Sequence, residues 1–144
     1  MSTRSIIKII SDNNTIHFYR HWDGYLEEGG YELACLLKAN RSYTKFIKAL
    51  INQQRPIYEH DMGHPLYELV YGADMGEEYT YYIEFKYDYS KGIFKEAEIN
   101  VKEHHYKKPD IWLFKNYISI DKFMKICSDK KYKATQKEIA RLSA

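Results

Sequence analysis

Cysteine is scarce in this sequence and long apolar runs are missing, and each shortage excludes a class of protein. The 144 residues include two cysteines, Cys35 and Cys127, and both lie in apolar helical patterns. We therefore expect two buried free thiols in a reducing compartment, and no disulfide framework. The longest apolar runs span only a few residues, so no membrane-spanning helix is expected. The N-terminal residues also lack the apolar core of a signal peptide.

The common catalytic signatures are missing as well. The sequence has no Gly-x-Ser-x-Gly nucleophile elbow, no Gly-rich phosphate loop and no His-Glu-x-x-His metal motif. His60 and His64 have the spacing of two zinc ligands on one helical face, but the glycine and proline beside His64 disfavour a helix. We therefore expect no enzyme, no bound metal and no cofactor. The most distant alternative is a metal-assisted hydrolase that uses His21, Asp23, His60 and His64.

Aromatic residues are abundant, and charge is unevenly distributed. Aromatic side chains make up 16% of the chain, and fifteen of them are tyrosines. The formal net charge is +2, but residues 59–98 hold ten acids against three bases, whereas residues 99–144 hold eleven bases against five acids. Such a separation of charge can steer a charged partner or pair two subunits. Two ordinary solvated faces remain the simpler explanation.

The length of the chain and its hydrophobic periodicity predict a single domain of the α+β class. We expect an antiparallel sheet of four to five strands, built from two hairpins, with helices packed on one face. In order along the chain, the pattern predicts an N-terminal β-hairpin (1–25), a helical pair (30–52), antiparallel strands (66–101) and a basic helical C-terminal segment (111–144).

Local signals refine these elements. The helical pattern begins at the glycine pair 29–30, Asn40 is expected to end the first helix, and Ser42 to cap the second. In the C-terminal segment, polar residues 130–133 predict a break, followed by a short basic helix over residues 135–142.

Residues 19–25, with the sequence Tyr-Arg-His-Trp-Asp-Gly-Tyr, are the densest group of chemically versatile side chains. In the predicted hairpin, Arg4 opens the first strand and Arg20 ends the second, so antiparallel pairing brings both arginines to the same end of the sheet. Guanidinium groups bind phosphate oxygens and aromatic rings stack on bases, so this end suits a phosphate-bearing ligand. The predicted ligand-binding residues are Arg4, Arg20, His21, Trp22, Asp23 and Tyr25. A purely architectural role for the same residues stays open.

The same segment resembles a known family. Residues 2–6 (Ser-Thr-Arg-Ser-Ile), residues 19–25 and the helix start near Gly30 are similar to a family of small proteins common in tailed-phage and prophage genomes. Its members share a Thr-Arg-Ser opening, a Tyr-x-His-x-Asp-Gly-Tyr segment and a later tyrosine-rich strand, to which residues 78–83 are similar. One departure is Leu26, where relatives often carry proline.

This resemblance implies a phage protein that works in the cytoplasm of a bacterial host, and the family brings no established activity. Small accessory phage proteins often serve host takeover. We therefore expect a protein that counters a host defence system by binding, as anti-CRISPR proteins do. It would either sequester a phosphorylated nucleotide signal or inhibit an immune effector or nuclease. No membrane partner is expected, and self-association into a homo-oligomer stays open.

The main alternative is a nucleic-acid-binding protein that uses the basic, tyrosine-rich C-terminal third. Lysines are interleaved there with aromatic residues, a pattern that suits a surface that follows phosphates and stacks on bases of RNA or DNA. The predicted contact residues are Lys130, Lys131 and Lys133. A solvated lysine face competes with this interpretation. The acidic residues 59–98 leave a further option, mimicry of nucleic acid toward the basic groove of a nuclease.

Overall fold

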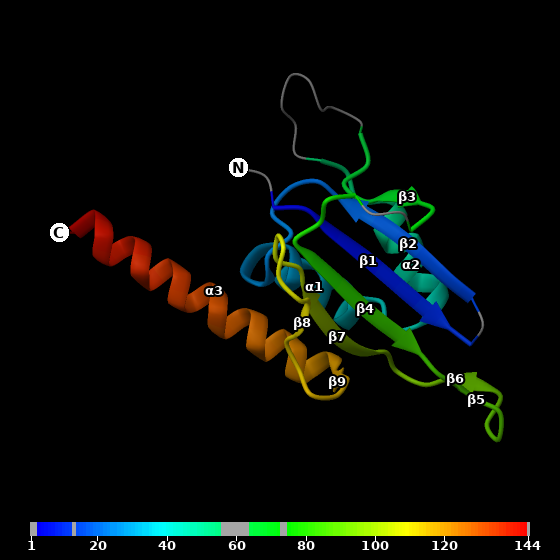
Figure 1. Cartoon of the computed structure of the whole chain (residues 1–144). Coiled ribbons are helices and arrows are strands. Elements are labelled where there is room, and N and C mark those ends of the chain that lie inside the picture. The colour runs from blue at the N-terminus through cyan, green and yellow to red at the C-terminus, as the bar shows by residue number, and fades with distance from the viewer. Residues whose placement is uncertain (1–2, 13, 56–63, 73–74, 144) are drawn as a thin grey trace.

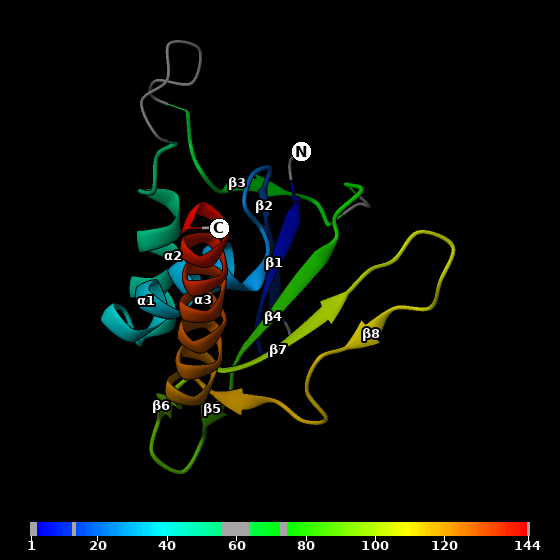
Figure 2. The ribbon, with the colours of Figure 1, turned by 90° about the vertical axis from the view of Figure 1, so that its left-hand side faces the viewer.

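The computed structural model describes residues 3–12, 14–55, 64–72 and 75–143 (Figure 1). Within these residues three α-helices and a mixed, mostly antiparallel sheet of seven strands form two layers, which confirms the α+β class. The helices lie on one face of the sheet, and no described helix covers the other face (Figure 2).

Four strands form the body of the sheet. β1 (Ser5–Ser11) lies between β2 (Asn14–Arg20), which is antiparallel to it, and β4 (Tyr79–Phe85), which is parallel, and β7 (Glu98–Glu103) runs antiparallel to β4. The prediction of a purely antiparallel sheet is therefore wrong at one pairing. Between β2 and β4 the chain passes through two helices and a short edge strand, and a connection of this length can place β4 parallel to β1. The alternation of hydrophobic residues shows which face of a strand is buried, but it does not show whether the neighbouring strand is parallel or antiparallel.

Short strands extend this body at both edges. β3 (Glu68–Val70) pairs with β2, whereas β8 (Ile111–Trp112) and β9 (Ile118–Ser119) both pair with β7. The predicted count of four to five strands is too low because these edge strands have only two or three residues, too few to show alternation. β5 (Tyr87–Asp88) and β6 (Ile93–Phe94) form a separate two-stranded hairpin.

The first two helices begin and end largely where the capping signals predict. Asn40 ends α1 (Tyr31–Ala39), and its side-chain amide donates to a carbonyl in the last turn at 3.0 Å. The Ser42 hydroxyl caps α2 (Tyr43–Ile51) by accepting from the backbone N–H of Lys45 at 3.3 Å.

A turn of π-helix, η1 (Leu26–Gly30), precedes α1, so the helical backbone begins at Leu26, before the predicted start at the glycine pair 29–30. Gly29 approaches the end of the 19–25 segment closely, and its N–H donates to the carbonyl oxygen of Asp23 at 2.8 Å. A Cβ atom at position 29 would lie 2.5 Å from that oxygen. Only glycine, which has no Cβ atom, permits this approach, and this explains why position 29 is a glycine.

The last helix, α3 (Ile120–Ser143), is continuous over 24 residues, so the predicted break at residues 130–133 is wrong. Lysine is a good helix former, and the helix contains neither glycine nor proline, so a polar stretch alone does not end it. The first half buries Ile120, Phe123 and Cys127. The second half, residues 132–143, is exposed and extends away from the body (Figure 1). None of the described helices combines the length and apolar character that a bilayer crossing requires.

The core fills the space between the sheet and the helices. From the strands it takes Ile7, Ile9, Phe18, Tyr81, Ile83, Phe85, Ile99 and Val101, and from the helices Leu33, Leu37, Phe46, Leu50 and Phe123. Tyr81 is completely buried, and burial raises the pKa of its hydroxyl well above the ordinary value. That hydroxyl donates to the carbonyl oxygen of Gly24 at 2.6 Å, which fixes the turn after β2 to the core.

Candidate functional site

Arg20, one of the two predicted anion-binding arginines, is buried, with 4% of its surface exposed. Its Nε donates to the backbone oxygen of Trp22 at 2.6 Å, and its Nη1 donates to the Tyr67 hydroxyl at 3.1 Å and to a carboxylate oxygen of Glu32. Burial disfavours the charge, but Tyr67 and Glu32 outweigh it and raise the pKa of Arg20. These contacts join β2 to α1 and to the segment before β3, an architectural role.

Arg4 lies at the same end of the sheet but on the opposite face. Its neighbour Ser5 is paired with Arg20, and successive strand residues point to opposite faces. The two guanidinium groups are therefore not brought together. The backbone N–H of Arg4 donates to a carboxylate oxygen of Glu78 at 2.6 Å. Within the described part of the chain, the Nε of Arg4 and the hydroxyl of Ser5 are buried without a hydrogen-bond partner.

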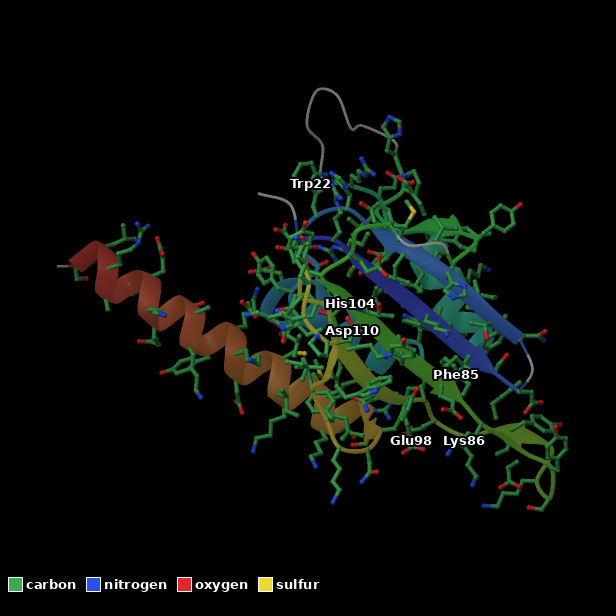
Figure 3. The ribbon with its side chains drawn as sticks, in the orientation of Figure 1. Trp22, Phe85, Lys86, Glu98, His104 and Asp110 are labelled. Atoms are coloured by element: carbon green, nitrogen blue, oxygen red, sulfur yellow. The ribbon has the colours of Figure 1, made fainter. Side chains whose placement is uncertain are left out.

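His21 and Trp22 form an aromatic group with Tyr19 on the side of Arg4. The Tyr19 hydroxyl lies 2.7 Å from His21 Nδ1, and the rings of His21 and Trp22 meet edge to face at 4.6 Å between centroids. Trp22 is 44% exposed and not in the core, and Figure 3 shows it at the end of the sheet. This group retains the exposed ring that a stacking ligand needs.

Asp23 and Tyr25 belong to the turn that leads into η1. Asp23 has a left-handed backbone, with φ at 54°, and the next residue, Gly24, donates its N–H to the Thr3 oxygen at 2.8 Å. Partial burial and the Asp23 carboxylate raise the pKa of Tyr25. The six predicted residues thus do not form one site: Arg20 is buried in an architectural role, Arg4, His21 and Tyr25 are half-buried, and Trp22 and Asp23 are exposed.

The predicted metal-assisted alternative falls partly outside the described residues, since His60 is not among them. His64 is exposed, and His21 contacts Tyr19. Among the residues that the structure describes, no group of three or more metal-ligating side chains gathers at one point. Cys35 and Cys127 are both free thiols; Cys127 is buried as expected, but Cys35 is only half-buried, so that part of the prediction is wrong.

A chain of three polar side chains, Thr80, His104 and Asp110, was missed by sequence reasoning. His104 Nε2 lies 2.7 Å from the Thr80 hydroxyl, and His104 Nδ1 lies 3.0 Å from an Asp110 carboxylate oxygen. Figure 3 shows His104 and Asp110 side by side, where they line a surface cavity of about 590 Å³. A carboxylate at Nδ1 favours a proton there, so Nε2 accepts from the threonine. The contacts join β4 and β7 to the loop before β8, and no sequence motif marks them.

The three predicted nucleic-acid-binding lysines divide into two groups. The Lys131 ammonium lies 3.3 Å from both carboxylate oxygens of Glu28 and 5.3 Å from the ring centroid of Tyr31. It therefore holds α3 against η1 and α1. Lys130 and Lys133 are exposed, and each lies well around the helix from Lys131.

Lys130 and Lys133 belong to a cationic stripe, which we define as Lys130, Lys133, Lys137 and Arg141. Successive spacings of three, four and four residues place these side chains along one side of an α-helix. All four are exposed, and Arg141 also pairs with Glu138 one turn away. The stripe begins at Lys130, just before the half of α3 that extends from the body, and continues along that half to Arg141.

Comparisons of the chain with protein-family models, with curated proteins and with solved structures find no match.

Proposed function

We propose that this chain binds nucleic acid and that the cationic stripe of α3 contacts the phosphate backbone. The observation that carries the proposal is the alignment of four exposed cations along one side of α3, three of them on the half, residues 132–143, that is exposed along its whole length. From Lys130 to Arg141 the helix rises roughly 16 Å, at 1.5 Å per residue. That length corresponds to roughly five nucleotide steps of a duplex.

The opposite side of this helix half distinguishes nucleic acid from a lipid surface. Tyr132, Ile139 and Leu142 are its large apolar residues, with 65%, 52% and 73% of their surfaces exposed. Three such residues give a narrow apolar side, and stable interfacial binding of a helix grows with the apolar area it inserts. Charge is the stronger feature of this surface, and phosphate is the anion that every nucleic acid presents regularly.

Charge reversal within the stripe tests the proposal. The double variant Lys133→Glu, Lys137→Glu exchanges two attractive contacts for two repulsive ones. We expect the slope of log affinity against log salt to become shallower by about two, with weaker binding of every sequence. The matched control is Lys91→Glu, Lys95→Glu, which makes the same charge change at exposed positions around the β5–β6 hairpin. If both double variants weaken binding equally, net charge and not the stripe is responsible, and the proposal is wrong.

The sequence-based expectation of a phage protein that counters host defence by binding rests on the resemblance of the N-terminal segment. It stays a prediction, as does its setting in the bacterial host cytoplasm. Binding to nucleic acid is compatible with that role, because nucleic acid is what defence nucleases act on. Infection of a defended bacterial strain by a phage with and without the gene tests it. Equal plaque numbers in the two infections would contradict it.

A further inference from the structure

The face of the sheet opposite the helices carries its own set of side chains, which strand register defines. Directly paired residues share a face, so one row across the sheet runs from Tyr19 through Ile6, Thr80 and Lys102 to Trp112. The next row runs from His17 through Lys8 and Tyr82 to Asn100. We call these two rows the open face; Lys8, Tyr82, Lys102 and Trp112 are accessible in it, whereas Tyr19, Ile6, Thr80 and Asn100 are buried. Figure 2 shows the three helices on the other side of the sheet.

Two aromatic rings and two ammonium groups form a compact cluster on the open face. The rings of Tyr82 and Trp112 lie 4.8 Å apart between centroids, inclined at 52°. The Lys102 ammonium lies 4.5 Å from the centroid of Trp112 and 5.5 Å from that of Tyr82, and the Lys8 ammonium lies 5.3 Å from Tyr82. Residues from four strands, β1, β4, β7 and β8, therefore meet at one point.

This cluster is separate from the hydrophobic core. Alternate residues of the same strands, such as Ile9 and Tyr81, are buried against the helices on the other face. Trp112 is 45% exposed, on an edge strand of only two residues that is held by its pairing with β7. A large exposed aromatic side chain flanked by cations offers a flat surface for a base and charges for its phosphates.

Negative charge limits the cluster on one side. In the row after Tyr82, Glu84 is paired with Glu98, and both face the same side as the cluster. Lys86 lies 3.9 Å from Glu98 and offsets part of that charge. A polyanion is therefore favoured over the rows of Lys8 and Lys102 and disfavoured over the row of Glu84.

We propose that the open face is a stacking site for unpaired bases, which names single-stranded nucleic acid as the ligand class. This inference rests on the proposed function, and it adds a second surface to the stripe on α3. Tyr82 and Trp112 stack on bases, and Lys8 and Lys102 contact the adjoining phosphates. A duplex does not satisfy this site, because its bases already stack on one another.

Trp112 fluorescence tests the site. The chain has two tryptophans, so Trp22→Phe leaves Trp112 as the only indole. The probes are a single-stranded oligonucleotide of about twelve nucleotides, within the length that one small domain covers, and the duplex of the same sequence. Stacking predicts quenching of Trp112 by the single strand and little quenching by the duplex. Equal quenching by both probes would overturn base stacking.

Affinity measured by fluorescence anisotropy of the labelled single strand gives the second readout. Tyr82→Ala is expected to weaken binding about tenfold, the loss typical of one stacked base. The control is Tyr89→Ala, which removes an exposed tyrosine, 77% accessible, beyond β5 and off the open face. If Tyr82→Ala lowers the melting temperature, Lys8→Gln with Lys102→Gln keeps both rings and tests the phosphate contacts alone.

The outcomes separate this inference from the proposed function. If the single strand binds in a salt-dependent way while Trp112 fluorescence and the affinity of Tyr82→Ala are unchanged, the open-face site is wrong and the α3 proposal stands. If neither probe binds at low salt, both proposals fail. If Tyr82→Ala instead dissociates a dimer, the face is covered by a second copy, and the stacking proposal is overturned.

Discussion

The guanidinium of Arg20 donates to the hydroxyl of Tyr67 at 3.1 Å, although 47 positions separate the two residues. Both side chains are buried, and the guanidinium also lies 5.6 Å from the centroid of the Tyr67 ring. Glu32 completes the group from α1. Arg20, from the segment of residues 19–25, therefore links β2 to α1 and to the residue just before β3.

Arg20→Leu is expected to destabilise the fold. It leaves the Trp22 carbonyl and the buried Tyr67 hydroxyl without their donor, whereas the Glu32 carboxylate is partly exposed and can be solvated. Leaving buried polar groups without a partner costs about 2 kcal/mol. Urea denaturation followed by circular dichroism measures the loss. The control is Arg41→Leu, which removes a more exposed arginine paired with Glu96 and Asp121 and should cost clearly less stability, because surface ion pairs contribute little. Equal losses in the two variants would contradict the architectural role of Arg20.

The fold shows which features of this sequence are local. The caps at Asn40 and Ser42 and the alternation along β4 were predictable because each depends on neighbouring residues. The parallel pairing of β1 with β4 was not, because it depends on which side of β1 the chain re-enters. The continuity of α3 was missed because a polar stretch was interpreted as a break, although lysine favours a helix.

The hydrogen-bonded chain Thr80–His104–Asp110 predicts that replacing His104 destabilises the fold and that replacing the adjacent His105 does not. His104→Ala leaves the nearly buried Thr80 hydroxyl without its partner, so we expect a loss of about 2 kcal/mol. His105→Ala removes only a contact to Glu103 at 3.6 Å, and its cost should lie within about 0.5 kcal/mol. Thermal unfolding of the two variants measures both. If both variants lowered the melting temperature equally, the hydrogen bonds of His104 would add nothing to the stability of the fold.

Thiol labelling tests the packing of α3 against α1. Burial raises the pKa of Cys127 from 9.0 to about 12, whereas Cys35 is only half-buried. At mildly alkaline pH we expect a thiolate-specific reagent to label Cys35 in the folded protein and Cys127 only after unfolding. Equal labelling rates for the two thiols would contradict the packing.

The same thiol links stability to pH. Below pH 9 both states keep the Cys127 proton, so this group gives no pH dependence there. Between pH 9 and about 12 the unfolded chain releases the proton while the folded chain retains it. Stability is therefore expected to fall as pH rises through this window. In the variant Cys127→Ala, the free energy of unfolding should fall less over this pH range. Urea denaturation at several alkaline pH values measures the difference.

The candidate sites were predictable from the sequence only in part. The lysine density of the C-terminal third was visible, but the helix separates Lys131, paired with Glu28, from the stripe. The two arginines at the hairpin end were visible too, but β-strand alternation places Arg4 and Arg20 on opposite faces. The Tyr82–Trp112 cluster was hidden, because it depends on the register of a two-residue strand against β7.

The central claim is that this chain binds nucleic acid through its phosphates. The most direct test is the affinity of the full chain for a labelled single-stranded oligonucleotide, measured over a series of salt concentrations. If the stripe and the open face bind phosphates, log affinity falls linearly with log salt. The expected slope is about −0.7 for each phosphate neutralised, and roughly four to six contacts give a slope of about −3 to −4. An affinity that does not change with salt, or no binding at the lowest salt, would contradict the account.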